Sequence, residues 1–199
     1  MRTILLAAVF FTGAATASAQ VFEFSVSGGV SRFGDAVLIE ANPETGDPQI
    51  TLDDGFRLAL RATLNTYRFF GHEIGYAYNR SGANIEGFSD DISIPIHQFG
   101  YNFLAYATPE GTRIRPFATG GVHFSSFFPP GSSVYYGNQV TKFGFNYGAG
   151  LKARITGMWG VRFDFRQFNT GKPDLFLTAE GPSGRLKQNE ISFGISLNL

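Results

Sequence analysis

The sequence predicts an all-β fold, an eight-stranded antiparallel up-and-down transmembrane β-barrel. Three observations predict it. Apolar and polar residues alternate in eight separate segments, so each segment can form a strand with one apolar and one polar face. The connections between these segments alternate between long and short. The number of segments is even, so the first and last strands can pair and leave no open edge.

The clearest strands are predicted for residues 142–155 and 159–168. In the first, aromatic or aliphatic residues occupy every second position from Phe143 onward, and Gly, Asn, Lys and Arg occupy the others. The second repeats the pattern from Trp159 to Phe165, with Gly, Arg and Asp between the apolar residues. Because successive side chains of a strand point to opposite faces, the two segments form a hairpin with one apolar and one polar face.

The other strands follow from the same alternation. In the second segment, for example, Phe56 and Leu58 face away from Arg57 and Arg61. Pro95 cannot donate a ladder hydrogen bond, so it is expected to lie beyond the central pairing of its strand. In chain order the predicted strands are 21–33, 55–67, 72–79, 92–106, 113–124, 142–155, 159–168 and a last strand that runs through Ile191 to Leu199.

The connections divide into two sets. Short turns are predicted at 68–71, 108–111 and 156–158, and longer polar segments at 35–54, 80–91, 127–140 and 169–187. All short turns would lie at one end of the barrel and all long connections at the other. This asymmetry is typical of outer-membrane barrels, whose periplasmic turns are short and whose external loops are longer. Both chain termini are then expected on the periplasmic side.

Alternation alone does not say which face points outward. A soluble eight-stranded barrel such as a lipocalin points its apolar face inward, and Gly157-Met158-Trp159 resembles the Gly-x-Trp element of that family. In lipocalins, however, this element lies in the first strand. The polar face here mixes Gly with opposite charges, which suits a narrow filled lumen. Aromatic residues also cluster near the predicted strand ends, as interfacial girdles do: Tyr67, Phe69, Phe70, Tyr106 and Trp159 at the short-turn end, and Phe33, Phe56, Tyr78, Phe143 and Phe168 at the other. We therefore predict that the apolar faces contact lipid.

Residues 1–19 are predicted to be a signal peptide, and residues 20–199 the barrel domain. Arg2 supplies a positive start, an apolar stretch follows, and Ala17-Ser18-Ala19 forms a small-residue cleavage site before Gln20. The protein is therefore expected to be exported. The chain has no Cys, so we expect its stability to come from a closed sheet rather than from disulfides.

Charged residues on the polar strand faces are expected to project into the lumen. A buried charge is costly unless it is paired. Arg162, Asp164 and Arg166 lie two apart, so Asp164 can be flanked by two guanidinium groups. An eight-stranded interior is just wide enough for side chains to fill, so we interpret the charges as a plug, with a gate or a narrow anion-preferring path as the alternative. The predicted lumen charge network consists of Arg57, Arg61, Glu73, Lys152, Arg154, Arg162, Asp164, Arg166 and Glu190.

With these features the sequence resembles the family of small outer-membrane β-barrels, the OmpA/OmpX-like or porin-like eight-stranded proteins, over essentially all of residues 21–199. The resemblance includes the C-terminal assembly signal of such barrels, whose polar residue, Gly and two spaced apolar residues are matched by Ser192, Gly194, Leu197 and Leu199. The family usually ends in Phe, and Leu199 departs from that pattern. The resemblance implies localisation in the bacterial outer membrane, contact with membrane lipid and lipopolysaccharide, and insertion by the barrel-assembly machinery.

The resulting hypothesis is a non-enzymatic integral outer-membrane protein with an envelope-structural or surface-interaction role. One alternative is a narrow porin for small solutes, and another is an enzyme that modifies lipid A. The 16 basic and 16 acidic residues cancel, which argues against a nucleic-acid partner. The sequence identifies neither a cofactor nor a ligand for the external loops.

The enzyme alternative rests on His123 and Ser125, which share one strand face. A hydrolytic site needs an acidic residue that orients the His, and neither this strand nor the connection 127–140 contains Asp or Glu. We therefore assign no catalytic residue. Asp53-Asp54 and Asp90-Asp91 carry oxygen ligands suited to divalent cations, but they lack the spacing of a calcium loop. We interpret them as solvated charge and assign no metal site.

Overall fold

The computed structural model describes residues 21–34, 36–39, 49–85, 92–128, 139–173 and 184–199. Among them, no helix is long and apolar enough to cross a membrane. The described residues form nine strands: β1 (Val21–Arg32), β2 (Ala36–Ile39), β3 (Ile50–Thr66), β4 (Phe70–Ile85), β5 (Ile92–Tyr106), β6 (Ile114–Phe127), β7 (Val140–Arg154), β8 (Trp159–Gly171) and β9 (Arg185–Asn198).

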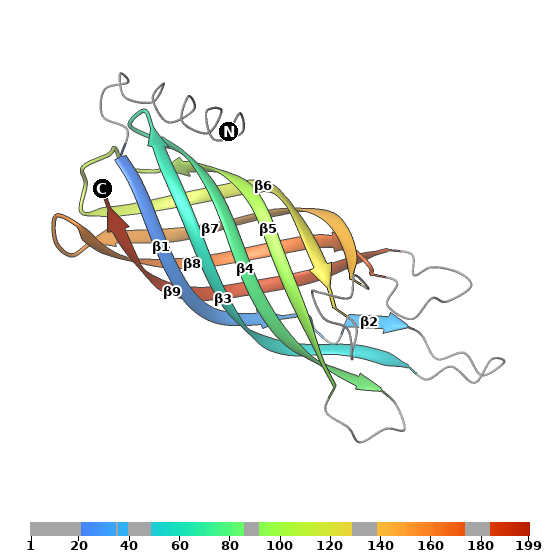
Figure 1. Cartoon of the computed structure of the whole chain (residues 1–199). Coiled ribbons are helices and arrows are strands. Elements are labelled where there is room, and N and C mark those ends of the chain that lie inside the picture. The colour runs from blue at the N-terminus through green and yellow to red at the C-terminus, as the bar shows by residue number, and fades with distance from the viewer. Residues whose placement is uncertain (1–20, 35, 40–48, 86–91, 129–138, 174–183) are drawn as a thin grey trace, which may run out of the picture.

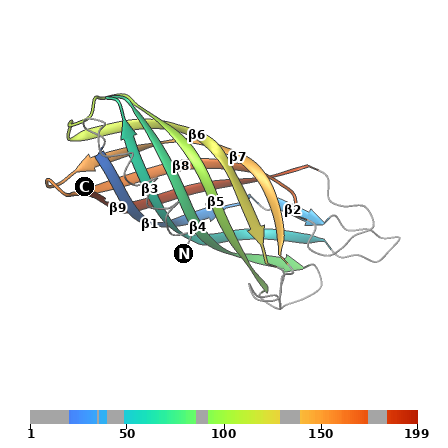
Figure 2. The same ribbon diagram turned by 45° about the horizontal axis from the view of Figure 1, so that its top comes forward.

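Eight of these strands close into an antiparallel barrel (Figure 1). From β3 to β9 each strand pairs with the next one in sequence, and β1 pairs with both β3 and β9. The short strand β2 pairs only with β3, at one end of the barrel. Figure 2 shows that the strands tilt and wind around a common axis. The prediction of an eight-stranded up-and-down barrel is therefore confirmed.

The two ends of the barrel differ. The turns 67–69, 107–113 and 155–158 lie at one end, together with the start of β1 and the C-terminus (Figure 1), and we call this the short-turn end. The other connections lie at the opposite end, which we call the long-connection end. They join β1 to β2, β2 to β3, β4 to β5, β6 to β7, and β8 to β9. The predicted separation of the two sets of connections is therefore correct.

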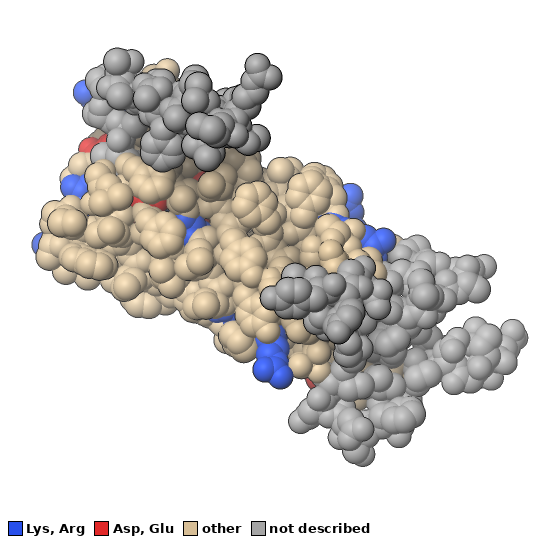
Figure 3. All heavy atoms as spheres, in the orientation of Figure 1, with Lys and Arg blue, Asp and Glu red and all other residues tan. Residues whose placement is uncertain are grey.

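The apolar face of each barrel strand points outward. On β8, Phe163 and Phe165 are 46% and 47% exposed, whereas Asp164 between them is fully buried. Figure 3 shows the visible face of the barrel as mostly uncharged, with only small areas of Lys, Arg, Asp or Glu atoms between the outward-facing residues. Apolar side chains on this outer face contact lipid favourably, and the closed sheet pairs the backbone of each strand with its neighbours.

Several strands extend further toward the long-connection end than the alternation predicted. β3 begins at Ile50 rather than Gly55, and β4 ends at Ile85 rather than Asn79. The ladder continues because Leu52 pairs with Ala83, and both side chains are buried inside the barrel. The connection 86–91 is consequently shorter than the turn 107–113, so the prediction of strictly alternating lengths is wrong here.

The predicted long connections lose residues to strands at three further places. β2 forms within the predicted connection 35–54. Phe127 and Val140 are paired to each other at the ends of β6 and β7. β8 continues to Gly171 and β9 starts at Arg185, which shortens the predicted connection 169–187 at both ends.

At the long-connection end the polarity of the two faces reverses. A register shift between Leu52 and Gly55 leaves both Asp53 and Asp54 exposed, as a β-bulge does. Inside the barrel, the side chains at this level are apolar and buried, and we call them the apolar cap: Phe33, Leu52, Ala83, Ile94, Ile96, Phe127 and Leu186. The strands are thus polar outside and apolar inside beyond the lipid-facing band.

The predicted aromatic girdles need one correction. Phe33, Tyr106 and Phe168 are buried, with no more than 5% of each side chain exposed. Each lies an even number of positions from the lumen-facing residues of its strand, so its side chain points into the barrel. Phe56, Phe143 and Trp159 are exposed on the outer face as predicted.

Candidate functional site

The charged lumen is the candidate functional site, and most of the predicted residues come together there. Each lies at an inward position of its strand, so the closed barrel brings side chains from distant parts of the sequence into contact. The predicted residues that are buried in the lumen are Arg57, Arg61, Glu73, Lys152, Arg162, Asp164, Arg166 and Glu190.

Glu73 and Asp164 hold the centre of the network. Asp164 receives two hydrogen bonds from Arg162, at 2.8 Å from Nε and 2.9 Å from Nη2. Glu73 receives Nη1 of Arg162 at 2.9 Å and Nη2 of Arg166 at 2.7 Å. Nη2 of Arg166 also lies 2.9 Å from Asp164. Each carboxylate is therefore shared by two guanidinium groups, an arrangement of short charge-assisted bonds.

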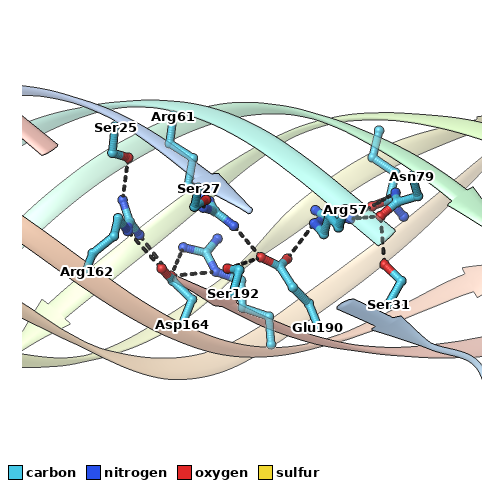
Figure 4. A network of polar contacts seen from close by, with 12 residues as sticks. Ser25, Ser27, Ser31, Arg57, Arg61, Asn79, Arg162, Asp164, Glu190 and Ser192 are labelled. Atoms are coloured by element: carbon cyan, nitrogen blue, oxygen red, sulfur yellow. Dashed lines mark hydrogen bonds and ion pairs between the residues drawn. The ribbon is translucent and has the colours of Figure 1, made fainter. Parts of the chain in front are cut away.

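Glu190 continues the network toward the long-connection end. Its Oε2 lies 2.8 Å from Nε of Arg57, and its Oε1 accepts from Nη2 of Arg61 at 2.5 Å. Arg57 then donates to Asn79 at 3.0 Å. Figure 4 shows two neighbouring sets of contacts, one that joins Ser25 to Arg162 and Asp164, and one that runs from Glu190 through Arg57 and Asn79 to Ser31.

A second group of charges lies nearer the short-turn end. Nζ of Lys152 donates to Glu23 at 2.9 Å and to the hydroxyl of Tyr106 at 3.0 Å. The guanidinium group of Arg115 lies 3.6 Å from the centre of the Tyr106 ring. Glu23 and Arg115 are buried but were not among the predicted network residues. The polar parity of their strands marks both positions as inward.

Arg154 differs from the other predicted residues. It is half-buried at the short-turn end of the lumen and makes no ion pair with the described residues. It lines a small opening together with Arg113, Arg115 and Glu110. Burial raises the pKa of the Glu110 carboxyl, and the nearby charges of Arg115 and Arg154 oppose this rise. Arg154 therefore lies at the short-turn edge of the lumen, outside the ion-paired group.

His123 and Ser125 share a face, as expected, but that face points into the lumen. Both are buried. Nε2 of His123 lies 2.8 Å from the hydroxyl of Thr170, and the hydroxyl of Ser125 accepts a hydrogen bond from Gln98 at 2.9 Å. Neither side chain contacts a carboxylate among the described residues, so the arrangement lacks the orienting acid of a hydrolytic site.

The two acidic pairs, which we interpret as solvated charge, form no metal site among the described residues. In the part of the chain that the structure covers, no group of three or more His, Asp or Glu side chains is placed to hold a metal ion. Asp54 instead accepts a hydrogen bond from the backbone of Phe33 at 3.0 Å and lies 3.7 Å from Arg32. Asp90 and Asp91 lie outside the described residues.

The predicted assembly-signal residues belong to β9 and its end, next to the seam with β1. Ser192 points into the lumen and donates to Glu190 at 2.6 Å. Gly194 pairs with Ser27 of β1, and a Cβ atom built on it would lie 2.3 Å from the carbonyl oxygen of Val26. Leu199 is exposed on the outside. Gly194 thus permits a close approach of the two strands that close the barrel.

The network can fill the lumen, and it contains more basic than acidic side chains. Among the described residues, the buried side chains with formal charge comprise six basic and four acidic ones. Because each buried carboxylate contacts at least one basic group, the arrangement suits a packed electrostatic plug. The basic residues are Arg57, Arg61, Arg115, Lys152, Arg162 and Arg166, and the acidic ones are Glu23, Glu73, Asp164 and Glu190.

Comparison with protein families gives a match over nearly the whole chain. The family described as "Outer membrane protein beta-barrel domain" matches residues 3–198. A search of curated proteins finds no match.

Several solved structures share the fold at low sequence identity. Neisserial surface protein A, from Neisseria, superimposes with a TM-score of 0.60 at 12% identity, over 90% of this chain and 97% of that one. The outer membrane protein OprG of Pseudomonas aeruginosa gives a TM-score of 0.59 at 13% identity, over 91% of this chain and 96% of that one. The outer membrane protein W of E. coli gives 0.53 at 16% identity, over 92% of this chain and 100% of that one. At these identities the likeness shows the fold alone.

Proposed function

The chain belongs to the outer-membrane protein β-barrel family, and on this premise we propose that it is a non-enzymatic integral protein of the bacterial outer membrane with an envelope-structural or surface-interaction role. The observation that carries the proposal is the filled lumen. The network of ion pairs occupies its middle, and the apolar cap lies beyond it at the long-connection end. A barrel closed in this way offers its outer face and its external connections for contacts, rather than a wide passage.

The first prediction concerns conductance. We expect the purified protein in planar lipid bilayers to show no large steady conductance, because side chains from opposite walls meet across the lumen. The measurement is single-channel recording at fixed voltage. Stable openings of the order of a nanosiemens would contradict the proposal. They would favour the second candidate, a narrow channel for small solutes, whose support is the excess of buried basic groups.

The chain offers a positive control for this experiment. A variant with Arg57→Ala, Arg61→Ala and Glu190→Ala removes two guanidinium groups together with the carboxylate that they share. The variant widens the lumen, and because Glu190 is removed together with both of its arginine partners, it leaves no unpaired carboxylate at this place. We expect frequent brief openings for this variant. A silent wild type beside a conducting variant would show that the recording can detect an open lumen.

We also propose how the protein reaches the membrane and what surrounds it there. Residues 1–19, which lie outside the described residues, would direct export. Membrane lipid and lipopolysaccharide would cover the outer apolar band, with the long-connection end facing the cell exterior. The barrel-assembly machinery would recognise the end of β9, where Ser192, Gly194, Leu197 and Leu199 lie.

The second prediction tests the closing seam at Gly194. We expect Gly194→Val to reduce the folded fraction several-fold, because a side chain there collides with the carbonyl of Val26. The measurement is the heat-dependent gel shift of membrane fractions, in which a closed barrel migrates differently before and after boiling. Gly157→Val is the control, since a Cβ atom at Gly157 meets nothing within 4 Å. Equal folding of the two variants would show that the seam tolerates a side chain.

A further inference from the structure

A small cavity lies inside the barrel beside the charge network. Its walls include Arg57, Arg61 and Arg166 on one side. Asn102 of β5, His123 of β6 and Asn146 of β7 line it as well. The cavity has a volume of about 20 Å³. A site needs roughly 10–15 Å³ to hold one water molecule, so there is room for a single occupant of about that size.

Glycines on β6 and β7 lie next to three residues that line this cavity. Gly121 pairs with Asn102 on one side and with Asn146 on the other. A Cβ atom on Gly121 would lie 2.5 Å from Oδ1 of Asn102, and one on Gly144 would lie 2.6 Å from Cε1 of His123. The absence of side chains at these two glycines therefore lets Asn102 and His123 lie close against the backbones of β6 and β7.

The polar atoms around the cavity are not all satisfied by the described residues. Nδ1 of His123, both amide atoms of Asn146 and Oδ1 of Asn102 are buried without a hydrogen-bond partner among them. Leaving such buried atoms unpaired destabilises the folded state. Nε2 of His123 lies 2.8 Å from the hydroxyl of Thr170. If this hydroxyl donates to Nε2, the neutral ring carries its proton on Nδ1. His123 and Asn146 can then both donate to one occupant.

The charges nearest to the cavity do not cancel. Four arginines surround three carboxylates at the centre of the lumen, and all seven side chains are buried. Glu23 is closer to Lys152, at 2.9 Å, than to Arg162, at 3.9 Å, so it is already paired elsewhere. One formal positive charge is left, and an uncompensated charge is costly in a dry interior. The four arginines are Arg57, Arg61, Arg162 and Arg166, and the carboxylates are those of Glu73, Asp164 and Glu190.

We propose that the cavity binds one small monovalent anion of the size of chloride. The anion would accept hydrogen bonds from the amide of Asn146 and from Nδ1–H of His123, and it would face the guanidinium groups of Arg57, Arg61 and Arg166. It would neutralise the central charge and satisfy the buried donors at the same time. The site is a structural element of the plug and does not depend on whether the barrel conducts.

Halide dependence of stability tests the site. The full mature protein is unfolded with urea in lipid vesicles, in sodium chloride or in sodium gluconate at the same ionic strength, because gluconate is too large for the cavity. We expect chloride to raise the urea midpoint and the effect to saturate with concentration. Trp159, the single Trp, reports the transition by fluorescence.

Asn146→Asp supplies the decisive variant, since its carboxylate places a fixed negative charge in the cavity. We expect the chloride-dependent shift to disappear in this variant. Asn84→Asp adds the same charge at an exposed position of β4 and is expected to keep the shift. Loss of the shift in both variants, or its retention in Asn146→Asp, would overturn the proposal.

A diffraction measurement locates the ion without any variant. Crystals of the wild type grown in sodium bromide are expected to show an anomalous peak between Asn146 and the arginines. Absence of this peak, together with equal urea midpoints in chloride and gluconate, would mean that the cavity holds water only. Bromide peaks confined to the outer surface would overturn the proposal equally.

Discussion

Glu73→Gln is expected to lower the free energy of unfolding by about 3–5 kcal/mol, the usual cost of removing one partner from a buried ion pair. Glu73 lies 2.9 Å from Arg162 and 2.7 Å from Arg166, and it is fully buried. A neutral amide cannot balance either guanidinium group. Its NH₂ group would also face donors, so one polar contact becomes unfavourable. The measurement is urea unfolding in lipid vesicles, followed by Trp159 fluorescence and by the heat-dependent gel shift.

An exposed ion pair of the same barrel provides the control. Arg32 and Asp54 lie 3.7 Å apart, and their side chains are 63% and 57% exposed. Arg32→Gln also removes one partner of a pair, but water solvates the charge that remains. We expect a change of about 0–1 kcal/mol for this variant. A similar small change for Glu73→Gln would mean that water reaches the centre of the lumen and that the plug is not dry.

Compensation within the network gives a second check on the same prediction. The double variant with Glu73→Gln and Arg166→Gln removes one acidic and one basic group, so the net charge of the network stays unchanged. Because the two residues are in contact, their effects should not add, and the double variant should be more stable than the sum of the single variants implies. Purely additive effects would show that the two side chains do not act as a pair in the folded barrel.

The lumen residues were predictable because the side-chain period of a strand does not depend on the rest of the fold. Arg57, Glu73 and Asp164 each sit on the polar parity of their own segment, so local sequence was sufficient to place them inside. Their partners were harder to predict. Lys152 pairs with Glu23, 129 residues away, and only the closure of β1 onto β9 and the tilt of the strands bring them together.

The apolar cap was missed although its signal is present in the sequence. Ile94 and Ile96 share the parity of Gln98, which faces the lumen, and Pro95 between them points outward. The apolar residues therefore change parity along β5 without any break in the strand. Such a change marks the level at which a strand leaves the lipid, because outward residues there meet water. Phe33 and Phe168 lie near strand ends, as girdle residues do, but both share the parity of lumen residues and are buried.

Phe165→Arg is expected to destabilise the barrel by about 2–4 kcal/mol, the cost of placing Arg on a lipid-facing position near the middle of a bilayer. Phe165 lies in the middle of β8 and is 47% exposed on the outer face. An Arg there can reach neither interface without deforming the lipid. The neighbouring inward position carries Arg166, whose guanidinium group is buried and paired. The same side chain one residue apart is thus unfavourable on one face and stabilised on the other.

The depth of the substitution decides the magnitude, and Phe143→Arg is the matched control. Phe143 is also exposed on the outer face, but it lies near the long-connection end of β7, where Arg can reach the lipid headgroups. We expect a cost of about 0–1 kcal/mol there. The free energies are compared by urea unfolding in vesicles of one lipid composition. Equal costs at the two positions would contradict a bilayer around the middle of the barrel. A gain in stability for Phe165→Arg would place water on the outer face, because only a hydrated surface favours Arg over an exposed Phe.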